Sequence, residues 1–140
     1  MKNICYNAIR GKKMKACRLT ITTVTDGKET HFTTDAQAEI TAINATIEYT
    51  ENGTQVRIEV EKNTVKISRE GDYTLHLIVQ EGVLTQGTLG IGGSEGTLSV
   101  LGKKVNYSLQ KDSLLLSMRY DLIFGDEPQE MKIRLFAKEK

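Results

Sequence analysis

The sequence predicts an all-β domain, a single antiparallel up-and-down barrel of about eight to ten strands. Short runs of alternating apolar and polar residues recur from about Ala16 to Ala137. Turn signals separate these runs every 8–12 residues or so, the spacing typical of a sandwich or barrel. No amphipathic helix of useful length intervenes, which disfavours a parallel βαβ sheet. Short connections favour pairing between chain neighbours, and closure of the meander removes the exposed sheet edges.

The first turn of the predicted meander is Asp26-Gly27. Both central positions of a two-residue hairpin loop need positive φ, and Asp-Gly meets this requirement. Residues 18–23 alternate before the turn, and residues 29–34 return after it with Phe32 in the middle. These residues predict a β-hairpin.

The next segment is weaker strand material. Residues 37–43 and 45–50 are predicted strands joined at Asn44, but Ala36, Ala38 and Ala42 lower the β propensity. A short helix over residues 35–42 is the alternative.

From Asn52-Gly53 onward the alternation is regular. The predicted strands are residues 56–61, 65–68, 73–79, 83–91, 97–101, 105–109, 114–123 and 131–137. A Gly102-Lys103 turn separates two of them. Their predicted inward side chains are bulky and indicate a partly filled interior: Val56, Ile58, Leu75, Leu77, Leu116, Met118, Tyr120, Ile133 and Leu135.

Length and charge limit the organisation and the class of protein. A chain of 140 residues suits one domain, with residues 1–15 as a disordered or loosely attached extension and residues 16–140 as the barrel. The 19 Lys and Arg against 18 Asp and Glu give no excess of positive charge, so we expect no nucleic-acid partner. The basic residues Arg10, Lys12, Lys13 and Lys15 lie outside the strand pattern.

Hydropathy and cysteine usage indicate a cytoplasmic protein. No apolar stretch reaches the length of about 18 residues that a membrane span needs, and polar residues interrupt the N-terminus where a secretory signal would be apolar. Cys5 and Cys17 have neither metal-ligand nor CxxC spacing, so we expect reduced thiols.

No residue pattern predicts catalysis, a cofactor or a metal site. His31 and His76 lie on different predicted strands, whereas a metal needs several converging ligands. Ser94 has glycines two positions before and two positions after it, but no predicted helix follows, so it does not form a nucleophile elbow. Six of the 12 glycines fall between Gly82 and Gly96, without dinucleotide or Walker spacing, so we expect them to bend strands rather than hold phosphate. We therefore predict a protein that is not an enzyme.

Arg69 is the strongest candidate for a binding residue. It continues the face of Val65 and Ile67, so the period of two points its side chain inward near one end of the barrel. Such a guanidinium either closes the barrel end through internal partners or anchors an anionic ligand head group. Tyr49 and Tyr120, in phase with apolar neighbours, supply hydroxyls to the same interior or pack in the core with one satisfied hydroxyl.

Several short motifs together resemble the YwiB-like family of bacterial proteins. They are Tyr49-Thr50-Glu51, Val65-Lys66-Ile67-Ser68-Arg69-Glu70-Gly71, Glu81-Gly82, Gly96-Thr97-Leu98 and Leu116-Ser117-Met118-Arg119-Tyr120-Asp121-Leu122. The resemblance implies a calycin-like (lipocalin-like) barrel of unknown function in a bacterial cytoplasm. This chain departs from the family at residues 90–95, where an aromatic residue and a Thr are usual, and near Gly102, where another Thr is usual.

Two functions remain open at this point. The first is non-enzymatic binding of a small apolar or amphipathic ligand inside the barrel, with Arg69, Tyr49 and Tyr120 as the site. The alternative is a packed barrel that serves as a protein-interaction module through its outer surface. A connected interior cavity of about 300 Å³ or more, with Arg69 at its lip, favours the binder. A filled barrel with an apolar patch outside favours the interaction module.

Overall fold

The computed structural model describes residues 14–140, which form a closed ten-stranded antiparallel barrel. The strands are β1 (Lys15–Thr25), β2 (Lys28–Ile40), β3 (Asn44–Glu51), β4 (Thr54–Glu61), β5 (Thr64–Glu70), β6 (Tyr73–Gln80), β7 (Leu84–Ile91), β8 (Ser94–Leu109), β9 (Ser113–Phe124) and β10 (Glu127–Glu139). Each strand pairs with its chain neighbours, and β1 pairs with β10 to close the barrel. The predicted all-β, up-and-down class is confirmed, and residues 14–140 contain no helix.

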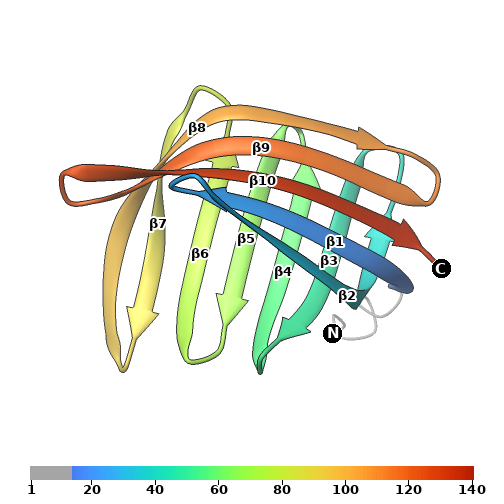
Figure 1. The fold of residues 1–140 in the computed structure, drawn as a ribbon, viewed down its shortest axis with the longest axis horizontal. Coiled ribbons are helices and arrows are strands. Elements are labelled where there is room, and N and C mark those ends of the chain that lie inside the picture. Colours follow the sequence, from blue (N-terminus) through green and yellow to red (C-terminus); the bar gives the residue numbers. More distant parts are fainter. Residues whose placement is uncertain (1–13) are drawn as a thin grey trace, which may run out of the picture.

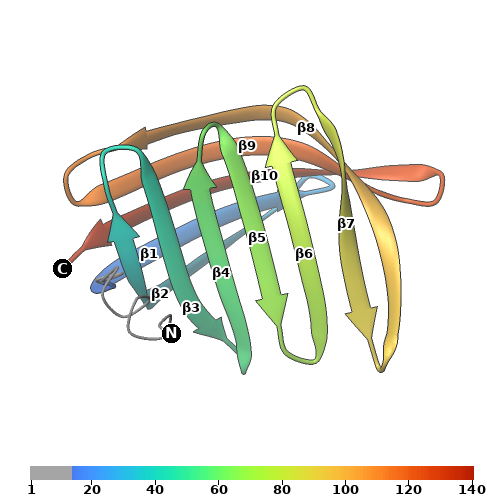
Figure 2. The same cartoon turned by 180° about the vertical axis from the view of Figure 1, so that it is seen from behind.

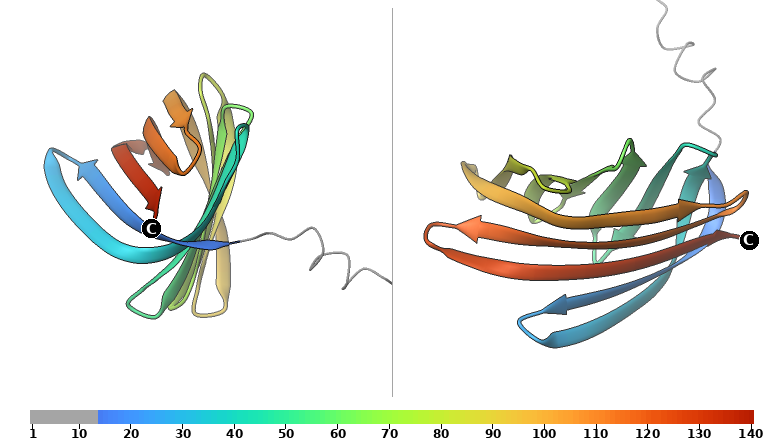
Figure 3. Two further views of the ribbon diagram at one scale, coloured as in Figure 1. Left: turned by 90° about the vertical axis from the view of Figure 1, so that its right-hand side faces the viewer. Right: turned by 90° about the horizontal axis from the view of Figure 1, so that it is seen from above.

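The barrel is flattened into two layers whose strands cross. β8, β9, β10 and β1 run across the view of Figure 1, and β3 to β6 run up and down behind them. Figure 2 shows the second layer from its own side. In Figure 3 the β1–β2 hairpin curves across from one layer to the other.

Tight turns set the register of the hairpins. Asp26-Gly27 and Asn52-Gly53 both take positive φ at each position, as the Asp-Gly and Asn-Gly signals predicted. Lys62-Asn63 and Gly92-Gly93 adopt the same left-handed conformation. The β1–β2, β3–β4, β4–β5 and β7–β8 hairpins therefore have two-residue turns with positive φ at both positions, which keep neighbouring strands paired.

Residues 37–43, predicted as a separate weak strand, instead supply the end of the long strand β2 and the turn after it, whereas residues 45–50 lie in β3 as predicted. β2 pairs with β1 without interruption from Lys28 to Ala38, and only Thr41–Ile43 form the turn into β3. The helical alternative over residues 35–42 is wrong, because the β1 partner supplies a complete ladder that outweighs the low propensity of alanine. Ala36 and Ala38 are buried, and their small side chains suit the crowded interior there.

The predicted Gly102-Lys103 turn is also wrong. β8 runs continuously, with a bulge between Gly102 and Lys104 that absorbs the irregularity. A Cβ on Gly102 would collide with the backbone carbonyl of Gln80, so the backbone of β8 packs directly against the end of β6 at this glycine. The glycine at position 102 marks a close approach of β8 to β6 rather than a reversal of the chain.

Large side chains fill one half of the barrel. This half, the closed end, lies beside the β4–β5, β6–β7 and β8–β9 turns. It is packed with fully buried residues: Cys17, Leu19, Ile47, Val60, Val65, Val79, Val100, Leu114 and Leu116. The opposite half, the open end, lies beside the β1–β2, β3–β4, β5–β6 and β9–β10 turns and has fewer such residues.

Two ladders of the barrel are short. β2 and β3 pair only from Gln37 to Ile40 on β2, and β6 and β7 pair only from Tyr73 to His76 on β6. Beyond these paired residues, β2 and β3 diverge toward the open end, and β6 and β7 diverge toward the closed end. The first divergence leaves the inward side chains of β2 and β3 to bridge the layers near the open end.

The predicted N-terminal extension falls mostly outside the described residues. Of residues 1–15, the structure describes only Met14 and Lys15, and Lys15 already belongs to β1. A helix long and apolar enough to cross a membrane does not occur within residues 14–140.

Candidate ligand-binding cavity

The open half of the barrel encloses a cavity with a volume of about 380 Å³. This volume lies within the range of about 300–1,000 Å³ that is common for small-molecule sites. The cavity is lined by Ile21, Thr23, Thr30, Phe32, Tyr49, Glu51, Val56, Ile58, Ile67, Arg69, Tyr73, Leu75, Leu77, Met118, Tyr120, Leu122, Met131, Ile133 and Leu135. Most of these side chains are apolar, and they come from β1–β6, β9 and β10.

The period of two explains how these strands build one wall. Val56, Arg69 and Leu75 are direct cross-strand partners on β4, β5 and β6, so they share the inner face. One step toward the closed end, Ile58, Ile67 and Leu77 form the next row. Polar groups therefore lie near the open end of the cavity, and aliphatic groups lie at its floor.

Arg69 is the principal charge in this wall. Its side chain is 24% exposed, and its Nη2 lies 3.7 Å from Oε1 of Glu51. That separation is too long for a hydrogen bond. The guanidinium carbon lies 5.8 Å from the centre of the Tyr73 ring, within cation–π range.

The guanidinium of Arg69 has an unused donor. Its Nε is buried and has no hydrogen-bond partner among the described residues. A buried donor without a partner costs about 1–3 kcal/mol. A loose ion pair and an orphan N–H together leave this arginine able to bind a further acceptor.

Tyr49 lies beside this charge pair. Burial, with a smaller effect of Glu51, raises the pKa of Tyr49 to about 12, and Arg69 acts in the opposite direction. The Tyr49 and Phe32 rings lie 5.8 Å apart at an interplanar angle of 42°. These two rings bridge β2 and β3 where the backbone ladder between them has ended.

Tyr120 lies on another part of the wall, on β9. Only 2% of the residue is exposed, and burial alone raises its pKa to about 12. Tyr120 lines the cavity, so its hydroxyl can contact a molecule bound there.

The structure brings Arg69, Tyr49 and Tyr120 to one cavity, as the period of two predicted. Glu51 and Tyr73 also line the cavity, although the sequence pattern did not single them out as site residues. Both are in phase with inward neighbours, Glu51 with Tyr49 and Tyr73 with Leu75. Their position next to a turn hid this signal, because a turn residue is expected to face solvent.

Comparison with protein families shows the family to which this chain belongs. Residues 16–135 match the family described as a domain of unknown function (DUF1934), which is most of the chain. This chain belongs to the DUF1934 family. The resemblance stated from the sequence motifs is thereby confirmed at the level of the family.

A solved structure shows the same fold. The crystal structure of YwiB protein from Bacillus subtilis matches 92% of this DUF1934 chain and 94% of its own, with a TM-score of 0.79 and 16% sequence identity. At that identity the likeness concerns the fold alone. Comparison with curated protein sequences gives no match.

The glycine-rich segment of this DUF1934 chain contributes turns and close contacts. Gly92 and Gly93 form a left-handed turn, and a Cβ on Gly87 would lie 2.6 Å from the carbonyl oxygen of His76. These roles agree with strand bending. His76 is exposed and lies 3.3 Å from Ser68 Oγ, outside the cavity. Within residues 14–140, no group of three or more His, Cys, Asp or Glu is placed to hold a metal ion.

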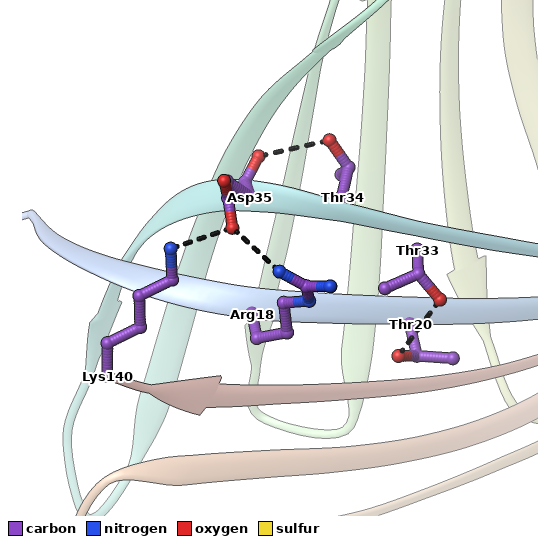
Figure 4. A network of polar contacts seen from close by, with 6 residues as sticks. All are labelled: Arg18, Thr20, Thr33, Thr34, Asp35 and Lys140. Atoms are coloured by element: carbon purple, nitrogen blue, oxygen red, sulfur yellow. Dashed lines mark hydrogen bonds and ion pairs between the residues drawn. The ribbon is translucent and has the colours of Figure 1, made fainter.

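A separate polar network lies on the outside of β1 and β2, at the end of β10 (Figure 4). Asp35 Oδ1 lies 2.7 Å from Lys140 Nζ and 3.3 Å from Arg18 Nη1. Lys140 first, and Arg18 second, lower the pKa of Asp35. The network ties the end of β10 to the β1–β2 hairpin, and its side chains are exposed, so its role is in the barrel seam rather than in a site.

Proposed function

We propose that this DUF1934 barrel binds a small amphipathic molecule, with an apolar portion on the aliphatic floor and an anionic head group at Arg69. The observation that carries the proposal is the cavity of about 380 Å³ in which a largely buried guanidinium keeps a free donor. Apolar walls with a few converging polar groups are typical of small-molecule sites.

Charge supports an anionic head group over a cationic one. Glu51 only partly compensates Arg69, since the pair is separated by 3.7 Å. A carboxylate can accept two parallel N–H bonds from a guanidinium, which gives both energy and orientation. The hydroxyls of Tyr49 and Tyr120 would supply further donors inside the cavity.

The proposal is for binding without chemical conversion. The lining residues include neither serine, cysteine nor histidine, the usual nucleophiles and bases, and Glu51 is engaged with Arg69. A calycin-like classification and a cytoplasmic location belong to the same proposal. The free, buried thiol of Cys17 supports the second of these.

Dodecanoate and dodecanol test the proposal, since they share a chain and differ in head group. We expect dodecanoate to bind more tightly than dodecanol by isothermal titration. The Arg69→Leu variant should lose this preference, with dodecanoate affinity falling about tenfold or more, while dodecanol binds as before.

Arg57→Leu is the matched control, because Arg57 lies on the neighbouring strand β4 and faces outward, paired with Glu48 and Glu59. It should bind both probes as the unmodified chain does. Equal loss in both arginine variants, or binding of neither probe by the unmodified chain, would overturn the proposal.

A further inference from the structure

Four cationic side chains gather on the outer face of β8, β9 and β10. These strands belong to the layer that runs across Figure 1. The four cations are Lys104, Arg119, Lys132 and Arg134, and all are exposed. Lys104 lies directly opposite Arg119 in the β8–β9 ladder, and Arg119 lies directly opposite Lys132 in the β9–β10 ladder. Like charges directly opposite one another destabilise a sheet, so this row does not stabilise the barrel.

The acids nearby do not neutralise this cationic face. Lys103 lies 3.2 Å from Asp121 and 3.7 Å from Glu130, so it engages both carboxylates. Glu130 also lies 3.8 Å from Arg119 Nε. The remaining three cations of the face have no ion-pair partner among residues 14–140.

Shape and apolar surface accompany the charge. The four cations line a shallow groove of about 490 Å³ together with Thr22 and Ser117. Next to it, Leu115 and Phe136 are cross-strand partners, 54% and 43% exposed. The cationic groove and the apolar pair Leu115 and Phe136 therefore lie side by side. Both are on the opposite side of the sheet from the cavity.

We propose that this cationic face binds an acidic, extended segment of a partner protein, with an apolar side chain of that segment on Leu115 and Phe136. Carboxylates on alternate residues of an extended segment repeat about every 6.6 Å, a spacing that flexible Lys and Arg side chains can follow. The site is distinct from the proposed ligand cavity and does not depend on it.

The chemistry favours a short acidic segment over a nucleic acid or a membrane. The whole chain has a net charge of only +1, so it lacks the broad positive field of a nucleic-acid binder. Among residues 14–140, the groove lining itself holds no aromatic side chain, whereas single-stranded nucleic acids stack on several.

Fluorescence anisotropy with a labelled twelve-residue peptide tests the proposal. In the peptide, glutamate alternates with serine and one serine is replaced by leucine; the control peptide carries glutamine for glutamate. We expect the acidic peptide to bind, with affinity that falls as salt rises, and the glutamine peptide not to bind.

Two double variants with the same change in net charge locate the site. Lys132→Glu with Arg134→Glu should weaken acidic-peptide binding about tenfold or more. Lys66→Glu with Lys111→Glu, at exposed positions away from the face, should leave it unchanged. The milder Lys132→Gln with Arg134→Gln should also weaken binding and gives the same answer if charge reversal impairs folding.

Three results would overturn the proposal. The first is equal binding of the acidic and glutamine peptides, and the second is equal weakening by both double variants. The third is tighter binding of a single-stranded DNA oligonucleotide, or of vesicles containing phosphatidylserine, than of the acidic peptide.

Discussion

At the scale of single residues, Arg69 carries the functional argument because its surroundings satisfy it incompletely. Glu51 is close enough to attract the guanidinium but too far away to hydrogen bond with it. Interior charges in proteins are usually fully paired, so a loose pair in a cavity wall indicates a group that exchanges partners.

Removal of the Glu51 charge should therefore strengthen anion binding. In Glu51→Gln the guanidinium has no competing carboxylate, so dodecanoate affinity should rise several-fold while dodecanol affinity stays constant. Isothermal titration measures both. Glu48→Gln, which alters an outward carboxylate of the same strand paired with Arg57, should change neither. Weaker dodecanoate binding by Glu51→Gln would show that Glu51 helps to hold the head group.

The buried hydroxyl of Tyr120 makes stability sensitive to alkaline pH. The pKa of Tyr120 is about 12 in the folded chain against a normal value of 10.0. Between these values the unfolded chain releases a proton that the folded chain retains, so the free energy of unfolding falls as pH rises from 10 toward 12. The free energy of unfolding keeps its full value below pH 10, and the loss above that pH is on the order of 2–3 kcal/mol.

Urea unfolding at pH 9 and pH 11.5 measures this effect. Tyr120→Phe should lose less stability between the two pH values than the unmodified chain. Tyr107→Phe should retain the full alkaline loss, because its hydroxyl lies outside the cavity and accepts a bond from the backbone N–H of Asn63. An unchanged alkaline loss in Tyr120→Phe would contradict the burial of this phenol.

At the scale of elements, close approach between strands governs the irregular positions. β8 crosses near β6 at Gly102, where the backbone N–H of Gly102 donates to the carbonyl of Val83 and the Gly102 carbonyl accepts from Gly82. A side chain at Gly102 would enter the backbone of Gln80. Gly96, on the same strand, has no atom within 4 Å of the position of a Cβ.

Alanine at these two glycines should therefore have opposite outcomes. Gly102→Ala should lower the free energy of unfolding by about 3 kcal/mol or more, since backbone must move. Gly96→Ala should be neutral or stabilising by about 0.5 kcal/mol, because it restricts only the unfolded chain. Thermal and urea unfolding compare the two, and similar losses in both would contradict the close crossing of β6 and β8.

The strands and their inward faces could be predicted from sequence because period two and turn residues are local signals. The prediction that a turn divides β8 into two strands was wrong, because the sequence alone does not distinguish a glycine at a bulge from a glycine in a turn. The continuity of β2 was missed because its ladder with β1 is a tertiary interaction. Arg69, Tyr49 and Tyr120 followed from phase, whereas the cavity volume depends on strand number and barrel flattening, which no local pattern encodes.

At the scale of the whole molecule, the barrel is filled at one end and hollow at the other. Val65 lies in the closed end and is 0% exposed, whereas Val56 lines the cavity. The two valines lie on neighbouring strands, and both face inward. The same enlargement should therefore have different consequences at the two sites.

Substitution of each valine by phenylalanine tests whether the closed end is filled and the open end is hollow. Val65→Phe should overpack the closed end and lower the free energy of unfolding by about 1–3 kcal/mol. Val56→Phe should cost less, because its ring extends into the cavity and gains apolar contacts there. Urea unfolding provides both values, and an equal cost at the two sites would contradict a hollow open end.

Native mass spectrometry with dodecanoate tests the central claim most directly. The unmodified chain should carry one dodecanoate per molecule, and Val56→Phe should carry none because its ring occupies the same space. Val24→Phe, on the outer face of β1 beside the cationic groove, is the matched control and should retain one. Absence of the adduct from the unmodified chain, or an undiminished adduct on Val56→Phe, would show that the cavity is not a ligand site.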